Sequence, residues 1–215
     1  MSCLDVLRYG NTASDNVLIQ PVDNHDLAVI ENEIQKIAGM SGDNFLLLAV
    51  KVNRWNEDLS PWSAPAVFGN ENFGEGASEM LTEIMDLAPD KEKTYYIGGY
   101  SQAGLFSLWA SYQTDIFSGV AAASPSMWFP GFLEYMKNHD IQTGKVYLSL
   151  GDREEKTRNP VMATVGERIR ESYALLREKG IPCTLEWNQG NHFREPDLRT
   201  AKAFAWLLKG DQHAD

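Results

Sequence analysis

The stretch Tyr95–Gly104 reads YYIGGYSQAG, and it decides the fold. It begins as an apolar strand, turns tightly at Ser101, and continues into residues whose apolar positions recur at helical spacing. A serine between a strand end and a helix start requires small residues two positions away on each side, and Gly99 and Ala103 meet that requirement. Such a turn exposes the serine hydroxyl and directs the amide of Gln102 to the same side, as a donor for an anion.

Strands and helices are predicted to alternate on both sides of this turn. Apolar runs predict strands at 17–20, 45–52, 95–100, 117–123, 145–150 and 182–187. Helical spacing predicts helices at 26–38, 75–88, 103–112, 132–138, 160–179 and 196–208. This alternation is typical of a mainly parallel, doubly wound sheet with helices on both faces, so we expect a three-layer α/β/α fold. No linker, repeat or low-complexity tract interrupts the pattern, which predicts a single domain over residues 1–215.

The composition is that of an ordinary globular protein, with 43% hydrophobic and 11% aromatic residues. The formal net charge of -11 and the lack of a basic run disfavour nucleic acid as a partner. The N-terminus lacks the basic and apolar segments of a signal peptide, and the longest apolar run, 45–50, is too short to span a bilayer. We therefore expect a cytoplasmic protein with no membrane contact. Cys3 and Cys183 are expected as free or buried thiols rather than as a disulfide.

A serine nucleophile needs a base, and His192 is the candidate. It follows the last predicted strand and precedes the last predicted helix, at the sheet edge where Ser101 is expected. His139 is expected at a solvated helix end and His213 lies in the C-terminal tail. His25 lies near the start of the first predicted helix and either shapes the pocket or begins that helix. No His-x-His or His-x-x-x-His spacing occurs, so we expect no metal site.

An acid should orient the base from the loop after strand 145–150, which reads GDREEK. This loop offers three carboxylates. We favour Glu154, because an acid three residues past the glycine that ends the strand returns over the sheet edge. Asp152 is the main alternative and Glu155 the third. The chain order serine, acid, histidine is one of the known permutations of the catalytic triad, and it occurs in doubly wound sheets.

Aromatic residues gather in two predicted loops. The long loop 53–74 carries Trp55 and Trp62, and loops of this length inside a compact domain tend to be functional. Trp128 follows strand 117–123. These three side chains are the predicted substrate-binding residues, suited to a flat or apolar group. The alternative is that the rings only hold the loops to the body of the domain.

At these residues the chain resembles the α/β-hydrolases. More narrowly, it resembles the esterase family that contains the enterobactin esterases, feruloyl esterases and esterase D-type enzymes. The resemblance covers most of the chain from Val17 onward and rests on Gly99–Gly104 (GYSQAG), Ala123–Trp128 (ASPSMW), Leu148–Glu154 (LSLGDRE) and Gly190–His192 (GNH). It implies serine-dependent hydrolysis of a small-molecule carboxylic ester through an acyl-enzyme, with no metal or organic cofactor.

The chain departs from the pattern of this family in three places. Ala103 stands where the family often has glycine. The family's usual His-Gly is replaced by Pro21-Val22-Asp23, from which the second oxyanion donor is expected, around Val22 and Asp23. The short N-terminus implies that the leading antiparallel strands are reduced or missing. No insertion is long enough for a helical lid, so the aromatic loops are expected to form the pocket walls.

Other functions stay open on the same residues. An acyl thioesterase would use the same triad, although no basic cluster for nucleotide phosphates is visible. A peptidase of this fold usually carries a gating domain, for which the chain has no room. From a different class, an inactive member of the fold would serve as a binding protein, and the presence of both Ser101 and His192 argues against that.

Overall fold

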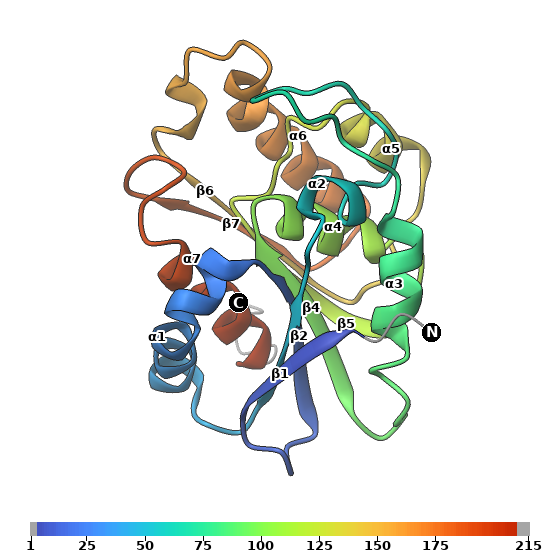
Figure 1. Cartoon of the computed structure of the whole chain (residues 1–215), viewed down its shortest axis with the longest axis vertical. Helices are drawn as coiled ribbons and strands as arrows, with labels where there is room; N and C mark the ends of the chain where they lie inside the picture. The colour runs from blue at the N-terminus through green and yellow to red at the C-terminus, as the bar shows by residue number, and fades with distance from the viewer. Residues whose placement is uncertain (1–3, 210–215) are drawn as a thin grey trace.

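One seven-stranded sheet organises the chain in the computed structural model, which describes residues 4–209 (Figure 1). The strands are β1 (Asp5–Gly10), β2 (Asn16–Val22), β3 (Leu46–Lys51), β4 (Thr94–Tyr100), β5 (Phe117–Ala123), β6 (Val146–Gly151) and β7 (Cys183–Asn188). The α-helices are α1 (Asn24–Ser41), α2 (Trp55–Asp58), α3 (Ala77–Met85), α4 (Gln102–Ala110), α5 (Phe132–Asn138), α6 (Val165–Glu178) and α7 (Pro196–Leu208). Short 3₁₀ turns cover Glu154–Lys156 and Met162–Thr164.

The strand order is β1-β3-β2-β4-β5-β6-β7, and every pair except β1–β3 is parallel. This arrangement confirms the predicted doubly wound α/β sheet. β1 runs antiparallel to β3 at the edge, so the leading antiparallel part of the fold is reduced to one strand in the described residues. The sequence did not predict β1, because most of its residues are exposed and give a weak apolar signal.

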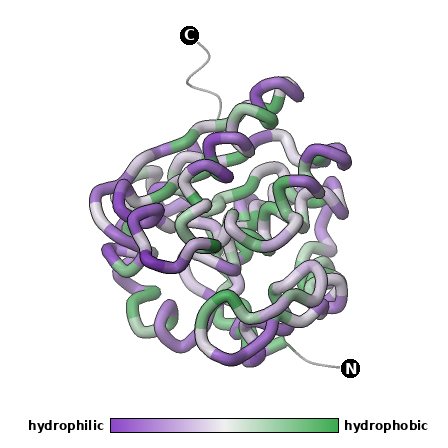
Figure 2. Tube along the Cα trace, turned by 90° about the horizontal axis from the view of Figure 1, so that it is seen from above, coloured by the Kyte–Doolittle hydropathy of each residue, from purple (hydrophilic) through white to green (hydrophobic). Residues whose placement is uncertain are grey.

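Two layers of helices enclose the sheet (Figure 1). Helices α1 and α7 pack on one face, where Leu18, Ile37 and Phe204 are fully buried. Helices α3 to α6 cover the other face. Viewed from above, hydrophilic segments dominate the outline and more hydrophobic ones lie inside (Figure 2). Burying each large apolar side chain contributes about 1.5–3 kcal/mol, so these two cores supply most of the stability that holds the strand ends in place.

Strand β2 continues past the residue at which the sequence predicts its end. Pro21 lies within β2, aligned with Val50 of β3, whereas the pairing of β2 with β4 stops at Ile19. A proline lacks the N–H needed in a ladder. It is accommodated here because β2 has only one neighbour at that level. The strand therefore reaches Val22, next to the start of α1.

Helix boundaries differ from the sequence prediction by a few residues. The helix predicted at 75–88 covers Ala77–Met85, and the one predicted at 160–179 begins only at Val165, after the 3₁₀ turn Met162–Thr164. The long loop 53–74 contains the short helix α2 and a bridge between Ala64 and Phe73. Helix ends fray and are the least predictable part of an element.

The described residues form one sheet with its helices and no separate domain. None of the helices in residues 4–209 has the length and apolar character needed to cross a membrane. Within the same residues, no three histidine, cysteine or acidic side chains come together as a metal site. Cys183 is a free, half-buried thiol whose pKa is raised by burial. Cys3 and His213 lie outside the described residues.

Candidate active site

Ser101 lies at the turn between β4 and α4 with a strained backbone, at φ 58° and ψ -117°. The turn requires small neighbours. A Cβ added to Gly99 would lie 2.6 Å from the Cβ of Ala103, and one added to Gly104 would lie 3.0 Å from the carbonyl oxygen of Gly99. A left-handed conformation at a residue other than glycine is uncommon and is found at nucleophile turns. The strand, tight turn and helix that the sequence predicts around Ser101 are therefore present.

His192 lies between Ser101 and Glu154. Its Nε2 is 3.0 Å from the Ser101 hydroxyl oxygen, and its Nδ1 is 2.7 Å from a carboxylate oxygen of Glu154. Both contacts are satisfied when Nδ1 carries the proton, which it donates to Glu154, while Nε2 accepts from the serine hydroxyl. The imidazole is thus oriented to receive a proton from Ser101.

The three carboxylates of the acid loop have different partners. Glu154 is buried and contacts His192. Asp152 is exposed and accepts a hydrogen bond from the amide of Gly190 at 2.7 Å. Glu155 forms an ion pair with Arg170 at 3.0 Å. Of the three predicted alternatives, Glu154 is the one in contact with the histidine.

Arg199 of α7 holds the other oxygen of Glu154, a contact that the sequence analysis did not anticipate. Its side chain is 2% exposed, and its Nη1 donates to Glu154 at 2.7 Å. Its Nη2 donates to the carbonyl oxygens of Gln189 and Asn191, at 3.3 and 2.9 Å. One guanidinium therefore connects the acid to the loop that carries His192, and such bonds to charged groups are stronger than neutral ones.

Tyr100 and Ser124 complete this buried network. The hydroxyl of Tyr100 accepts from Arg199 at 3.1 Å and donates to the carbonyl oxygen of His192 at 2.7 Å. Ser124 also accepts from Arg199, and it donates to Glu154 at 2.8 Å. The backbone of Ser124 is left-handed, at φ 42°. Three strand ends and α7 thus fix the position of the acid.

Burial on its own would raise the pKa of Glu154. Hydrogen bonds from His192, the amide of Gly151 and the hydroxyl of Ser124 outweigh burial and hold the pKa of this carboxyl below its ordinary value. Burial raises the pKa of Tyr100 to about 12, so this phenol keeps its proton at neutral pH and acts as a donor. The network therefore keeps Glu154 ionised beside His192.

The two predicted oxyanion donors lie in different settings. Gln102 begins α4, so its amide is one of the unpaired donors at a helix start, and its side chain donates to Ser60 at 3.1 Å. The carbonyl of Val22 accepts from Val52, which turns the Val22 peptide toward β3. The amide of Asp23 donates to the carboxylate of Asp26 in a capping box. The amide of Asp23 is therefore already paired in this arrangement.

A cavity of about 280 Å³ opens beside His192. Trp128 is among its lining residues, together with Met162, Val165 and Phe193. The remaining lining residues are polar, charged or small: Ser124, Pro125, Arg153, Glu154, Lys156, Thr157 and Asn191. This cavity meets the predicted base and acid, so we take it as the substrate site.

The other two predicted tryptophans lie elsewhere. Trp62 packs against Phe129 and Tyr135, with ring centroids 5.7 and 5.5 Å away, and its indole N–H donates to the carbonyl of Pro130. Trp55 opens the short helix α2 and packs against the core. Neither lines the cavity beside His192. The contacts of Trp62 match the alternative in which a ring holds its loop to the body.

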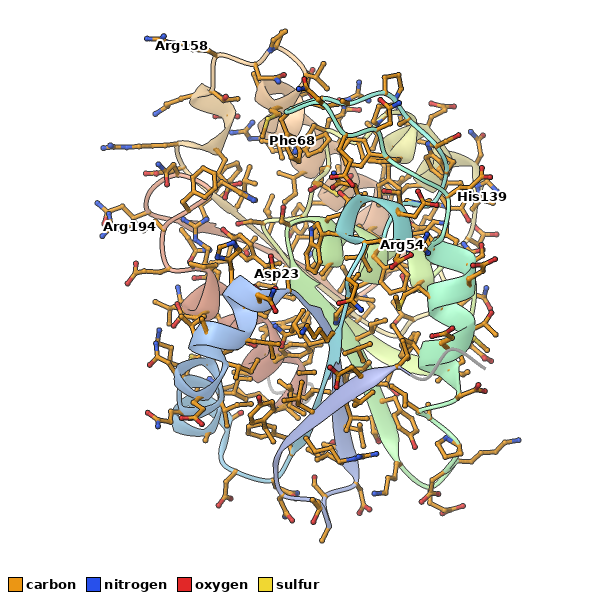
Figure 3. The ribbon with its side chains drawn as sticks, viewed as in Figure 1. Asp23, Arg54, Phe68, His139, Arg158 and Arg194 are labelled. Atoms are coloured by element: carbon orange, nitrogen blue, oxygen red, sulfur yellow. The ribbon has the colours of Figure 1, made fainter. Side chains whose placement is uncertain are left out.

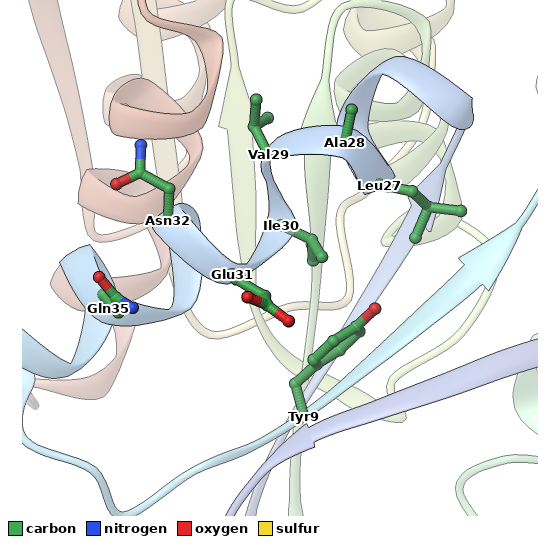
Figure 4. Close-up of a pocket in the computed structure, with 8 residues that line it drawn as sticks. All are labelled: Tyr9, Leu27, Ala28, Val29, Ile30, Glu31, Asn32 and Gln35. Carbon is green, nitrogen blue, oxygen red and sulfur yellow. The ribbon is translucent and has the colours of Figure 1, made fainter.

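A second hollow, of about 560 Å³, lies between Tyr9 of β1 and the outer side of α1, lined by Leu27–Asn32 and Gln35 (Figure 4). It is larger, but it contains no histidine or serine. The smaller cavity is the candidate site, because His192 and Glu154 line it and Ser101 lies 3.0 Å from His192.

Several solved structures share the architecture of this chain. An IroE-like serine hydrolase from Shewanella oneidensis matches with a TM-score of 0.76 at 13% identity, over 96% of this chain and 76% of that chain. A siderophore hydrolase from Aspergillus nidulans matches with a TM-score of 0.67 at 19% identity, over 93% of this chain and 85% of that one. A Bacillus cereus carboxylesterase matches with a TM-score of 0.63 at 14% identity, over 96% and 95% of the two chains.

These matches define the fold as that of the α/β-hydrolases. The resemblance to esterases that the motifs predict is confirmed at the level of fold, since serine hydrolases and siderophore hydrolases are among the matching structures. No protein-family model matches the sequence, and no curated protein matches it.

Proposed function

We propose that the chain is a serine hydrolase that cleaves a carboxylic ester through an acyl-enzyme. One observation carries the proposal: a continuous line of contacts runs from the Ser101 hydroxyl through His192 to Glu154, at 3.0 and 2.7 Å. These are hydrogen-bond distances, and the acid at the end of the line is ionised and held in place. The esterases among the matching structures give the same reaction class.

In the proposed acylation, the Ser101 oxygen attacks the ester carbonyl while its proton moves to Nε2 of His192. The amide of Gln102 stabilises the oxyanion, and the second donor is the amide of Val22, since that of Asp23 is bonded to Asp26. When the tetrahedral intermediate collapses, His192 gives its proton to the leaving alcohol. Glu154 stabilises the imidazolium throughout without taking the proton.

In the proposed deacylation, His192 removes a proton from water, and the resulting hydroxide attacks the acyl carbonyl. Collapse of the second tetrahedral intermediate releases the acid and returns the proton to Ser101. The products are one carboxylic acid and one alcohol. The substrate is a small ester, because the cavity beside His192 measures only about 280 Å³.

Labelling with a fluorophosphonate probe tests this proposal. We expect the wild type to be labelled and Ser101→Ala to be unlabelled, with ester hydrolysis about a millionfold slower in Ser101→Ala and His192→Ala. Ser126→Ala is the matched control, since its hydroxyl lies 3.4 Å from that of Ser101 but forms no contact with His192. Label on the folded wild type that persists in Ser101→Ala would contradict the proposal, as would no label at all.

A further inference from the structure

We propose that the cavity beside His192 selects esters that carry a negative charge next to a flat apolar group, and that Arg153 and Lys156 recognise the charge. The inference rests on the proposed function and adds a substrate class to it.

The two cations lie on the same side of one tight turn. Arg153 precedes the 3₁₀ turn Glu154–Lys156, so Arg153 and Lys156 are three residues apart. Side chains at this spacing eclipse one another in a 3₁₀ turn. The amide of Lys156 donates to the carbonyl of Arg153, and the amide of Arg153 donates to the carbonyl of Gly190, both at 3.1 Å. Both cations therefore project from a fixed backbone at the rim of the cavity.

Neither cation has an acidic partner. Within residues 4–209, no carboxylate lies within ion-pair distance of Arg153 or Lys156, although Glu155 in the same turn is paired with Arg170. The one carboxylate that lines the cavity, Glu154, is already bound by Arg199 and His192. The rim therefore has uncompensated positive charge in a chain whose formal net charge is -11. Charge of one sign beside a low-dielectric wall concentrates ligands of the opposite sign.

Another part of the cavity lining is apolar. Phe193 is 86% exposed although it is a large aromatic residue, and it lies next to His192 in the chain. Trp128 and Met162 extend the apolar lining. Flat rings pack well on such surfaces. An ester with a carboxylate on an aromatic ring would contact both the cations and the apolar residues of the lining.

A pair of esters that differ only in charge tests the inference: 4-(butyryloxy)benzoate and its neutral methyl ester. The ratio of their kcat/KM values is compared between wild type and Arg153→Gln/Lys156→Gln, so that the intrinsic reactivity of each ester cancels. We expect the double variant to lower this ratio roughly three- to tenfold, the range for two solvent-accessible ion pairs. The ratio in the wild type should also fall as sodium chloride is raised from roughly 20 mM to roughly 500 mM.

Arg158→Gln is the matched control. Arg158 lies on the same loop and is directed away from the body of the molecule, outside the cavity (Figure 3). Its loss removes one positive charge, half of what the double variant removes, and should change the ratio by less than about twofold. If the ratio falls as much in Arg158→Gln as in the double variant, the effect arises from the overall charge of the protein. That result would overturn the inference.

Binding of both esters to Ser101→Ala, measured by saturation-transfer NMR, separates the two proposals. Preferential binding of the carboxylate that disappears in the double variant supports the inference even if neither ester is hydrolysed, in which case the proposed function fails alone. Ser101-dependent hydrolysis of both esters with an unchanged ratio overturns the inference and leaves the proposed function standing. Equal binding of the two esters also overturns it.

Discussion

Two sets of residues beside the cavity differ in how firmly their side chains are held. The first, the buried wall, consists of Glu154 and, behind it, Arg199, whose side chains are 4% and 2% exposed and bind each other, the His192 loop and three strand ends. The second, the open wall, consists of Phe193, which is 86% exposed, and Lys156, which has no ion-pair partner in residues 4–209. The first wall holds charged groups away from water, where small displacements are costly. The second leaves its groups free to contact a ligand.

This difference indicates a division of labour. Residues of the buried wall should affect rate and stability together, because each of them holds a neighbour in place. Residues of the open wall should affect substrate affinity with little effect on folding. The following variants test the division, from the largest expected effect to the smallest.

Glu154→Gln should have the largest effect on the buried wall. Its side chain keeps the shape of the acid but loses the charge that orients His192, so we expect kcat to fall about a thousandfold to ten-thousandfold. The measurement is ester hydrolysis at neutral pH. Asp152→Asn is the control and should stay within about threefold of wild type, because an amide oxygen still accepts from Gly190. A larger loss in Asp152→Asn than in Glu154→Gln would show that the acid is misassigned.

Arg199→Met should unfold more easily, by about 3–5 kcal/mol, because it leaves Glu154 buried without its cation. Since the folded pKa of Glu154 is lowered, its contribution to stability is present above its ordinary pKa and disappears as the pH falls through the folded value. The loss in Arg199→Met should therefore be largest near neutral pH and shrink in acid. Urea titrations across pH measure this dependence.

A positioning role for Arg199 also predicts a change in the pH profile of activity. Without the guanidinium the pKa of Glu154 should rise, which moves the acidic limb of kcat to higher pH. Arg199→Lys retains the positive charge and should recover part of the wild-type profile. Equal profiles in all three proteins, at equal folded fractions, would limit Arg199 to a structural role.

Trp128→Ala and Trp62→Ala compare a ring that lines the cavity with a ring that only anchors a loop. Trp128 lines the cavity but is only 8% exposed and packs on Phe68 and Phe73, so Trp128→Ala should raise KM for an aryl ester about tenfold and also cost about 3 kcal/mol of stability. Trp62 packs on Phe129 and Tyr135, so Trp62→Ala should cost about 3 kcal/mol of stability and leave KM within about twofold. Steady-state kinetics and thermal unfolding of both variants measure the contrast, and a larger change of KM in Trp62→Ala than in Trp128→Ala would refute it.

Phe193→Ala should have the smallest effect. Because this ring is almost fully exposed, its loss should change the free energy of unfolding by less than about 0.5 kcal/mol. If the ring contacts substrate, KM for an aromatic ester should rise about two- to threefold, while KM for a short aliphatic ester stays the same. A stability loss above about 1 kcal/mol would mean that the ring supports the His192 loop instead.

Some features of the fold and of the site were predictable from local sequence pattern, and others depend on tertiary packing. The alternation of strands and helices predicted the sheet. Strands that are buried on both faces leave continuous apolar runs, and helices that are buried on one face leave apolar residues at helical spacing. Small residues around Ser101 and the positions of His192 and the GDREEK loop indicated where the site would lie. The assignment of catalytic roles to these residues stays a prediction that the variants above test.

The contacts of Arg199 depend on tertiary packing and could not be predicted from local pattern. One signal was available: Arg199, Ala203 and Leu207 are spaced four apart on α7, so a charged residue occupies the apolar stripe of that helix. A buried charge of this kind needs a partner of opposite charge, but the sequence alone does not show which residue that is. The predicted oxyanion donor at Val22 depends on tertiary packing in the same way, because the direction of one peptide decides whether its amide faces Ser101.

Arg199 also bears on how the protein is made. Ser101 and the strands around it emerge from the ribosome well before Arg199, which belongs to the last helix of the described residues. Until α7 docks, Glu154 has no cation to accompany it into the interior, and the His192 loop lacks two of its anchors. A nascent chain therefore holds an exposed serine turn without an assembled base and acid. Under the proposed function, hydrolytic activity would begin only after α7 has been synthesised. The time at which Ser101 first reacts with the fluorophosphonate probe would therefore report when folding is complete.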